Sequence, residues 1–164
     1  MIDAGTAREW FALDANTGVL FWRKRPSRGC VFAGDKAGSI DGQGYLRIKL
    51  LGRSHLAHRI VWVHHYGSPP QLEVDHINGD RSDNRIANLR DVDRAANNQN
   101  RRKSQSSNRS STLIGATFEI NMKKWKAQIS VNKKRIHLGY FESAEQAHAA
   151  YVAAKRLLHP TCSI

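Results

Sequence analysis

The chain has only two cysteines among its 164 residues. Cys30 and Cys162 stand near opposite ends and form no CxxC pair, so neither a zinc ribbon nor a disulfide framework is favoured. No apolar run approaches the roughly 18 residues that a membrane helix needs. The start MIDAGTAREWF also lacks the basic and apolar regions of a secretory signal. These absences predict a protein of the reducing cytoplasm that has no membrane partner.

Acidic side chains are also scarce. The 14 Asp and Glu residues face 26 Lys and Arg residues, which gives a net charge of +12 and favours a polyanionic partner such as nucleic acid. The excess is uneven, with +3 in residues 1–100 and +9 in residues 101–164. Between them, RRKSQSSNRSST (Arg101–Thr112) holds no acid and no large apolar residue. It predicts a basic linker at 101–112 between a domain at 1–100 and a second at 113–160.

The first domain alternates turn signals with short apolar patterns. DANTG is a turn before VLFW, and GQGYLRIKLLGRS has a period of two, which predicts a hairpin or a small sheet. HLAHRIVWVHHYG has helical spacing and ends at Gly67, before Pro69. No carboxylate or cysteine accompanies its four histidines at ligand spacing, so we favour structural or DNA-facing roles over metal binding for His55, His58, His64 and His65.

The stretch VDHINGDRSDNRIANLR, from Val74 to Arg90, is unusually polar. LEVDHI has a strand pattern, NGDRSDN a loop pattern and NLRDV a second strand pattern. DRAANNQN predicts a helix with Asp93 as its N-cap. Asp75 and His76 point to opposite sides of an extended strand, so both reach one site only near the strand end. A carboxylate and a helix amide would hold a hard divalent cation there, and a neutral imidazole would take a proton from water.

The spacing of Asp75-His76, Asn88 and Asn97 resembles the HNH endonuclease motif, also called the ββα-metal finger, of phages and mobile introns. The resemblance covers roughly residues 15–100 with varying strength, and its core lies at about 55–100. It implies that His76 is the general base and that Asn88 braces the loop. Asn97 stands at the third letter of the motif, where many members have histidine.

The resemblance also implies a single Mg²⁺ or Mn²⁺ held by Asp75 and Asn97, with His76 activating water for attack on a phosphodiester. Two loop arginines, Arg81 and Arg85, are candidate phosphate clamps, although a solvated loop charge is the commoner fate of such residues. Asn98 and Asn100 lie near enough to Asn97 to compete for its place. A polar loop between two strands is the alternative for the whole stretch.

The last third predicts a separate sheet and helix. KWKAQISV and KRIHLGYF alternate as a hairpin around Asn132-Lys133, and IGATFE adds a third strand. Ser143 and Gln146 form a capping box for a helix that ends before Pro160. Its face of mostly small residues, which includes Leu158, would lie close on one face of the sheet, and Ile136 and Leu138 of the sheet are expected to face inward. The other face would be polar and basic.

Residues 113–159 resemble the DNA-binding domain of the Apetala or ethylene-response-factor type, most specifically at LGYFESAEQA. The resemblance implies that the outward sheet residues contact duplex DNA in the major groove. Plant members have tryptophan where His137 stands, so no sequence preference carries over. An exposed solvated face is the alternative. The candidate contacts are Lys124, Lys126, Gln128, Ser130, Arg135 and His137.

Together these patterns predict an α+β protein: a small N-terminal sheet and a ββα-metal unit, then a three-stranded antiparallel sheet packed on one helix. The expected function is site-specific, metal-dependent cleavage of double-stranded DNA by a homing-type endonuclease encoded by a phage or mobile element. One alternative is a non-catalytic DNA-binding regulator, and another is a structure-selective phage nuclease. The target sequence, the number of strands cut and the oligomeric state do not follow from the sequence.

Overall fold

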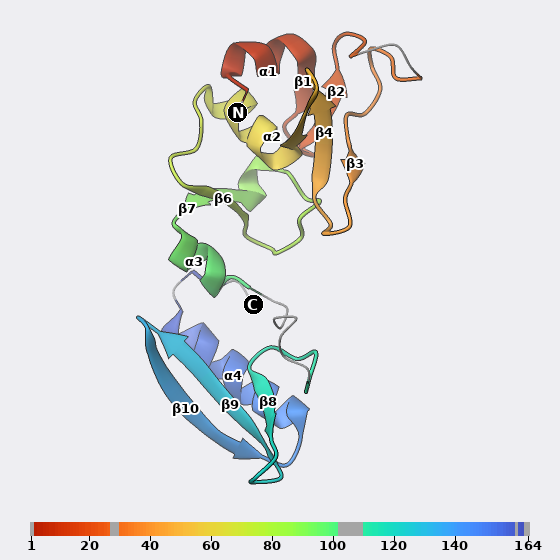
Figure 1. The fold of residues 1–164 in the computed structure, drawn as a ribbon. Helices are drawn as coiled ribbons and strands as arrows, with labels where there is room; N and C mark the ends of the chain where they lie inside the picture. The colour runs from red at the N-terminus through yellow and green to blue at the C-terminus, as the bar shows by residue number, and fades with distance from the viewer. Residues whose placement is uncertain (1, 27–29, 102–109, 160, 163–164) are drawn as a thin grey trace. The chain divides into compact units, whose positions relative to one another are not determined.

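The computed structural model describes residues 2–26, 30–101, 110–159 and 161–162. The chain forms two compact units, Met1–Arg94 and Ala95–Ile164. Both mix helices with small antiparallel sheets, so the α+β prediction is confirmed (Figure 1). Within the described residues, the helices are too short or too polar to cross a lipid bilayer.

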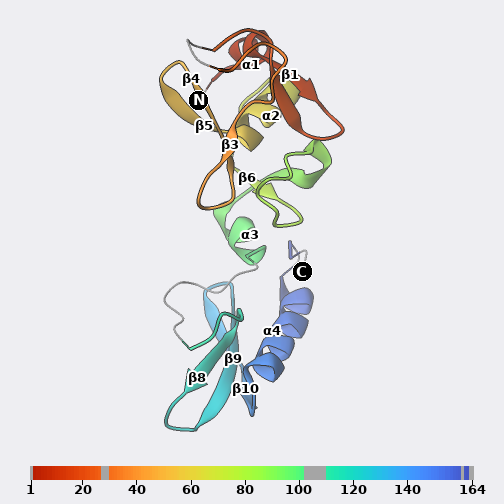
Figure 2. The ribbon, with the colours of Figure 1, turned by 90° about the vertical axis from the view of Figure 1, so that its right-hand side faces the viewer.

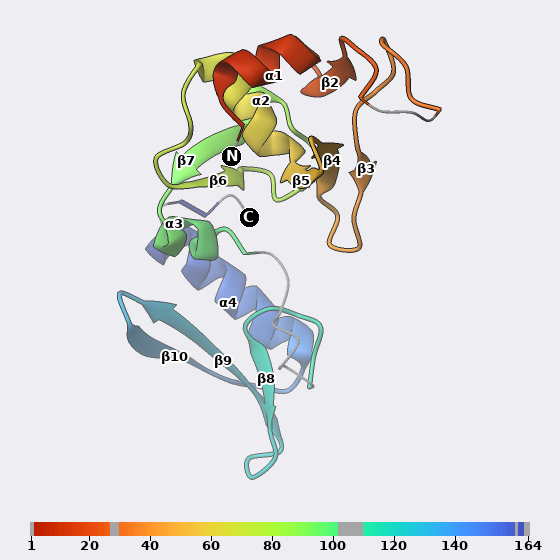
Figure 3. The same ribbon diagram turned by 45° about the horizontal axis from the view of Figure 1, so that its top comes forward.

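The first unit is built from short elements in close sequence order. Helix α1 contacts helix α2, and the two lie side by side (Figure 3). The strands pair as β1-β2, β3-β4-β5 and β6-β7, all antiparallel. The bounds are α1 Ala4–Trp10, β1 Phe11–Asp14, β2 Val19–Trp22, β3 Ser39–Ile40, β4 Leu46–Leu50, β5 Arg53–Leu56, α2 Ala57–Tyr66, β6 Glu73–His76, the 3-10 turn η1 Ile86–Asn88 and β7 Leu89–Val92.

The period of two in GQGYLRIKLLGRS corresponds to the hairpin β4-β5, which confirms that prediction. Ile48 and Leu50 point into a core that also contains Phe11 and Ile60. Strand β5 runs directly into α2, and Gly67 ends this helix in the left-handed conformation with φ 75°. The hairpin and α2 therefore share one buried face, as an alternating strand next to an amphipathic helix requires.

The turn between β1 and β2 supports the polar stretch from the outside. Gly18 has φ +70°, and a Cβ at this position would lie 2.2 Å from the carbonyl carbon of Asn84. Only glycine allows the two backbones to approach so closely. The N-terminal hairpin is therefore a backing for the loop that follows β6.

Strand, loop, strand and helix follow one another from Glu73 to Gln99, which confirms the predicted ββα order. In the β6-β7 pair, Asp75 lies opposite Arg90 and His76 lies opposite Leu89. Helix α3, Arg94–Gln99, groups from Ala95 onward with the second unit, whereas the sequence places it in the first domain. Within this second unit, the Thr161 hydroxyl donates to the α3 backbone carbonyl of Ala96. Most of the predicted linker at 101–112 lies outside the described residues.

The second unit is a three-stranded antiparallel sheet with the order β10-β9-β8, covered on one face by α4 (Figure 2). Asn132 and Lys133 both have positive φ, as a tight hairpin turn requires. The Ser143 side chain accepts the Gln146 N–H and begins α4 as predicted. The bounds are β8 Ala116–Glu119, β9 Lys124–Val131, β10 Lys134–Phe141 and α4 Ala144–Leu158.

Two inward positions predicted in this unit are wrong. Ile136 pairs with Ile129 as expected, but it lies on the edge strand β10 and is 39% exposed. Leu158 is also exposed, and Lys155 is buried in its place. The Lys155 ammonium donates to the backbone carbonyl of Arg101, a long-range contact that the helical pattern does not contain. Such a bond makes the burial of a lysine head group tolerable.

Candidate active site

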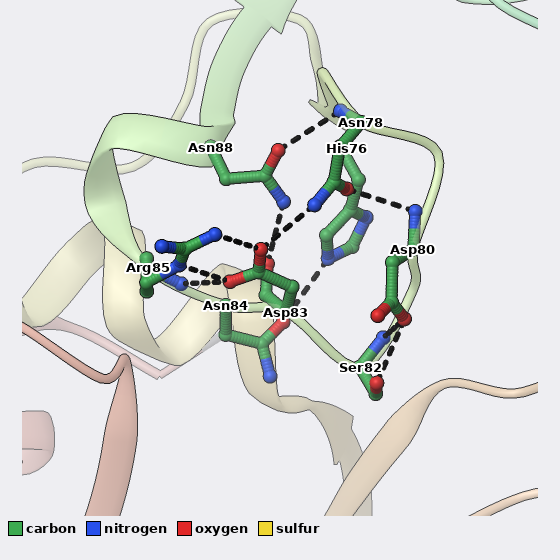
Figure 4. A network of polar contacts seen from close by, with 8 residues as sticks. All are labelled: His76, Asn78, Asp80, Ser82, Asp83, Asn84, Arg85 and Asn88. Atoms are coloured by element: carbon green, nitrogen blue, oxygen red, sulfur yellow. Dashed lines mark hydrogen bonds and ion pairs between the residues drawn. The ribbon is translucent and has the colours of Figure 1, made fainter.

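His76 is the last residue of β6 and is only 4% exposed. Its Nε2 lies 3.0 Å from the amide oxygen Oδ1 of Asn84 (Figure 4). An amide oxygen only accepts hydrogen bonds, so Nε2 carries the proton in this contact. The neutral ring then has Nδ1 as its basic nitrogen. Asn84, itself buried, thus selects the tautomer and orients the ring.

The loop that carries Asn84 is closed by Asn88, in η1. Asn88 Oδ1 accepts the Asn78 N–H at 2.9 Å, and Asn88 Nδ2 donates to the Asp83 carbonyl at 2.8 Å (Figure 4). Asn78 also donates from its side chain to the Asp83 carboxylate at 2.7 Å. One buried amide therefore ties both ends of the loop, and its part in the site remains a prediction.

Asp83 is the most strongly paired acid of the loop. Its carboxylate accepts two hydrogen bonds from the Arg85 guanidinium, at 2.8 and 2.6 Å. The bonds from Arg85 lower the pKa of Asp83 to about 2. Arg85 is thus engaged by its own loop, which competes with its predicted role as a phosphate clamp. Arg81 instead stacks over the Tyr45 ring, 4.6 Å from its centroid, and donates to the Gln43 carbonyl.

A second imidazole packs against His76. The His58 ring, from α2, lies edge-on to it with the centroids 4.9 Å apart, and Tyr45 contacts both rings. His58 is buried, and its Nδ1 has no hydrogen-bond partner among the described residues. Burial, aided by His76 and Arg59, lowers the pKa of His58 to about 3. His58 is therefore neutral at physiological pH and packs against His76 without repelling it.

The pKa of His76 is also lowered, and burial is the main cause. The hydrogen bond to Asn84 and the nearby carboxylates of Asp75 and Asp80 act in the opposite direction. A histidine that accepts a proton from water must be neutral beforehand. The burial of His76 provides that condition at neutral pH.

Asp75 precedes the histidine and points to its paired strand. Its Oδ2 accepts from both Nε and Nη2 of Arg90, at 3.1 and 2.8 Å, and the Asp75 side chain is 11% exposed. Among the residues that the structure describes, no group of three His, Cys, Asp or Glu side chains could hold a metal ion. A cation at Asp75 would therefore depend on amide, water or substrate oxygens for its other ligands.

Asn97, Asn98 and Asn100 all come from the α3 segment, which groups with the second unit. Asn100 is buried, with its backbone N–H donating to the carbonyls of Ala96 and Asn97. The predicted partnership of Asp75 with Asn97 remains a prediction, as does the choice among the three asparagines.

The buried His76 and the loop that Asn88 closes lie in a segment that matches a known family. Residues 55–99 match the family model of the HNH endonucleases. The chain therefore contains an HNH endonuclease domain. No curated protein and no solved structure matches the chain. The HNH domain begins one residue before Leu56, the N-cap of α2, and ends with α3.

Three residues that the sequence analysis did not assign to the site surround His76: Asn84, His58 and Tyr45. Asn84 was visible only as one of several asparagines in a turn-rich loop, and its eight-residue separation from His76 carries no periodic signal. His58 stood in a histidine-rich helix. The sequence contained no indication that the HNH domain would place His58 against His76.

The predicted DNA-contacting residues of the second unit lie on two strands. Register pairs Ser130 with Arg135 and Gln128 with His137, which brings each pair to one face. All four side chains are exposed. Two lysines of this sheet are instead ion-paired, Lys124 with Glu142 and Lys126 with Glu119. The exposed pairs are therefore the better candidates for contacts with an external partner.

Asn84→Ala is expected to lower the cleavage rate about 10-fold or more, since it removes the acceptor that fixes the His76 tautomer; losing such support typically costs about 10- to 100-fold. The measurement is the single-turnover nicking rate of the variant. Ser82→Ala is the matched control, because Ser82 lies in the same loop and its hydroxyl donates to Asp80 instead of to His76 or Asn84. Equal rates for both variants would remove Asn84 from the site.

Proposed function

We propose that the HNH domain hydrolyses phosphodiester bonds of double-stranded DNA, with His76 as the general base. The observation that carries this proposal is the buried, neutral His76 whose Nε2 is committed to Asn84. This arrangement presents Nδ1 to accept a proton from an attacking water. Asn88 keeps the loop closed, so the direction of the ring is set before substrate arrives.

The donor chemistry suits a hard divalent cation, Mg²⁺ or Mn²⁺. Mg²⁺ is commonly held by one or two carboxylates together with substrate phosphates and water. Asp75 would supply the carboxylate and Asn97 the amide oxygen. The bound cation would stabilise negative charge on the phosphate and on the leaving oxygen. Arg90 shares the Asp75 carboxylate and holds its direction in the protein without the cation.

The second unit would hold the duplex and give the enzyme its choice of site, as in a homing-type nuclease of a phage or mobile element. The supporting observations are the +9 charge of residues 101–164 and the exposed pairs Ser130–Arg135 and Gln128–His137. Phosphates would meet lysine and arginine side chains, while Gln128, Arg135 and His137 have the hydrogen-bonding groups that read base edges.

A non-catalytic DNA-binding regulator and a structure-selective nuclease are the two alternatives. The retained base, its amide partner and the bracing Asn88 favour catalysis, since a decayed site has no need for a selected tautomer. Nicking of supercoiled plasmid with Mg²⁺ or Mn²⁺, compared with the same reaction in a chelator, distinguishes a nuclease from a regulator. Cleavage of branched DNA in preference to linear duplex would favour the structure-selective enzyme.

Asp75→Ala is expected to raise the Mg²⁺ concentration for half-maximal nicking, or to abolish activity, because it removes the only charged ligand proposed. Asn97→Ala should have a smaller effect, since a neutral amide is the weaker ligand. The measurement is the Mg²⁺ dependence of the nicking rate for each variant. Asn98→Ala and Asn100→Ala are the matched controls. If either control is damaging while Asn97→Ala is silent, the proposed ligand is wrong.

A further inference from the structure

A pocket of about 270 Å³ lies in the first unit beside the start of α2. None of the residues around His76 lines it. Its polar lining consists of Arg47, Ser54, His55 and Arg59, and Ile2 and Ile60 supply apolar walls. In the β4-β5 register, Arg47 lies opposite Leu56 and Lys49 lies opposite Ser54, so Arg47 and Ser54 share one face of the hairpin. Side chains from the hairpin and the helix thus converge on one concave surface.

Arg59 is the unusual member of this pocket. Its Nε is buried and has no hydrogen-bond partner among the described residues. A guanidinium is always charged, and a buried donor of a charged group without an acceptor is unfavourable. Nε itself is out of reach of solvent, so an acceptor from outside the protein would meet the guanidinium where Arg59 lines the pocket. The pocket therefore favours a ligand with negatively charged oxygens.

The charge of the lining indicates which anion fits. Arg47 donates through Nε to the Asp41 carboxylate at 2.6 Å, so this pair is close to neutral. Among the residues that the structure describes, Arg59 has no ion-pair partner, unlike Arg47 in the same pocket. One uncompensated positive charge matches a monoanion, such as the phosphodiester group of a nucleic acid backbone.

The start of α2 adds further donors. Leu56 is the N-cap of this ten-residue helix and makes no side-chain capping hydrogen bond. The first backbone N–H groups of a helix lack partners within the helix, and they favour anions. Leu56 lines the pocket. An oxyanion beside Arg59 would therefore also lie close to the positive end of α2.

We propose that this pocket binds one backbone phosphodiester of the DNA duplex, through Arg59, Arg47, Ser54 and the start of α2. The inference rests on the proposed function, because it takes duplex DNA as the substrate. The same two elements lead to the catalytic histidine: Tyr45 directly precedes β4 and contacts His76, and His58 neighbours Arg59 and packs against His76. A phosphate held here would set the register of the duplex relative to His76.

The test measures binding of the full-length protein to a fixed duplex over a salt series in chelator, so that cleavage plays no part. Arg59→Gln is expected to lower the slope of log affinity against log salt by about 0.9, the value for one lost phosphate contact. Arg53→Gln is the matched control, because Arg53 lies on the same hairpin outside the pocket and its loss removes the same charge. A smaller change of this slope for Arg53→Gln than for Arg59→Gln supports a specific phosphate site at Arg59.

Arg59→Lys keeps the charge but not the planar fork, so it should weaken binding while leaving the slope nearly unchanged. This variant tests the proposal even if Arg59→Gln does not fold. Titration with inorganic phosphate, followed by the NMR signals of residues 54–60 and of Arg59 Nε–H, separates the sources of the anion. Shifts with duplex DNA at far lower concentration than with free phosphate identify the backbone phosphodiester.

Three results would overturn the proposal. They are a wild-type salt slope for Arg59→Gln, an equal decrease of the slope for Arg59→Gln and Arg53→Gln, and NMR signals that shift with neither duplex DNA nor inorganic phosphate. A preference for free phosphate over duplex would assign the pocket to a small anion and also contradict it. Failure of the nuclease function is distinguishable. In that case plasmid nicking is absent, while the affinity of Arg59→Gln for duplex DNA, measured in chelator, still differs from that of wild type.

Discussion

His76→Ala is expected to lower the rate of DNA cleavage by about 10²-fold or more, the usual loss when a general base is removed. Binding of DNA in chelator should stay close to wild type, because His76 is buried and cannot contribute a surface contact. The two measurements are single-turnover nicking and duplex affinity on the same preparation. Thermal unfolding measures how much stability is lost to the cavity that the smaller side chain leaves.

His65→Ala is the control for this variant, since His65 is an exposed histidine on α2. His76→Gln adds a second comparison: it retains an amide donor near Asn84 but offers no base at neutral pH. It should be as inactive as His76→Ala. A His76→Ala protein that cuts at the wild-type rate would exclude His76 from the chemistry.

The pH profile provides an independent check on the same residue. The neutral form of His76 is the active base, and it is populated above the pKa of the ring. Because burial lowers this pKa, the rate should stay on its plateau below the ordinary value of 6.5 and fall only at more acidic pH. His58, with a pKa of about 3, should contribute no step in the neutral range. A cleavage rate that already falls with decreasing pH above pH 6.5 would contradict the lowered pKa of the buried His76.

A chain ending at Asn100 is expected to lose affinity for DNA by about 10²-fold or more at physiological salt, with a salt slope lower by several units. Residues 101–164 carry +9 of the net charge of +12, so several lysine and arginine contacts to phosphates would be removed. Nicking should persist at low salt and high protein concentration. Cut positions should spread, because Gln128 and Arg135 are gone.

The controls for truncation keep the chain intact. Arg135→Gln with His137→Ala removes exposed groups of β10 and should relax the cleavage site with a small loss of affinity. Lys133→Gln, in the neighbouring turn, should affect affinity alone. The assays are salt titration of duplex binding and mapping of cut positions for every variant. An unchanged slope and unchanged cut positions in the truncated protein would favour the alternative of a solvated sheet face.

The sequence by itself determined most elements of this protein and indicated the residues that we propose for its chemistry. Alternation in GQGYLRIKLLGRS, the Asn132-Lys133 turn and the Ser143 cap are local signals, and each corresponds to an element in the structure. The Asp-His pair at a strand end also follows from one short segment, whereas the bracing role of Asn88 is what the resemblance to the HNH family implies. Local patterns suffice here because backbone conformation and side-chain direction depend on near neighbours.

The tertiary structure alone decided which groups surround His76 and how its charge is controlled. Asn84 reaches the ring through a closed loop that Gly18, a residue of the distant hairpin, supports from outside. His58 and Tyr45 arrive from separate elements and provide the burial that lowers the pKa of His76. The same holds for the buried Lys155 and the unpartnered Nε of Arg59. Burial and long-range contacts depend on how elements pack, and that packing has no periodic signature in the sequence.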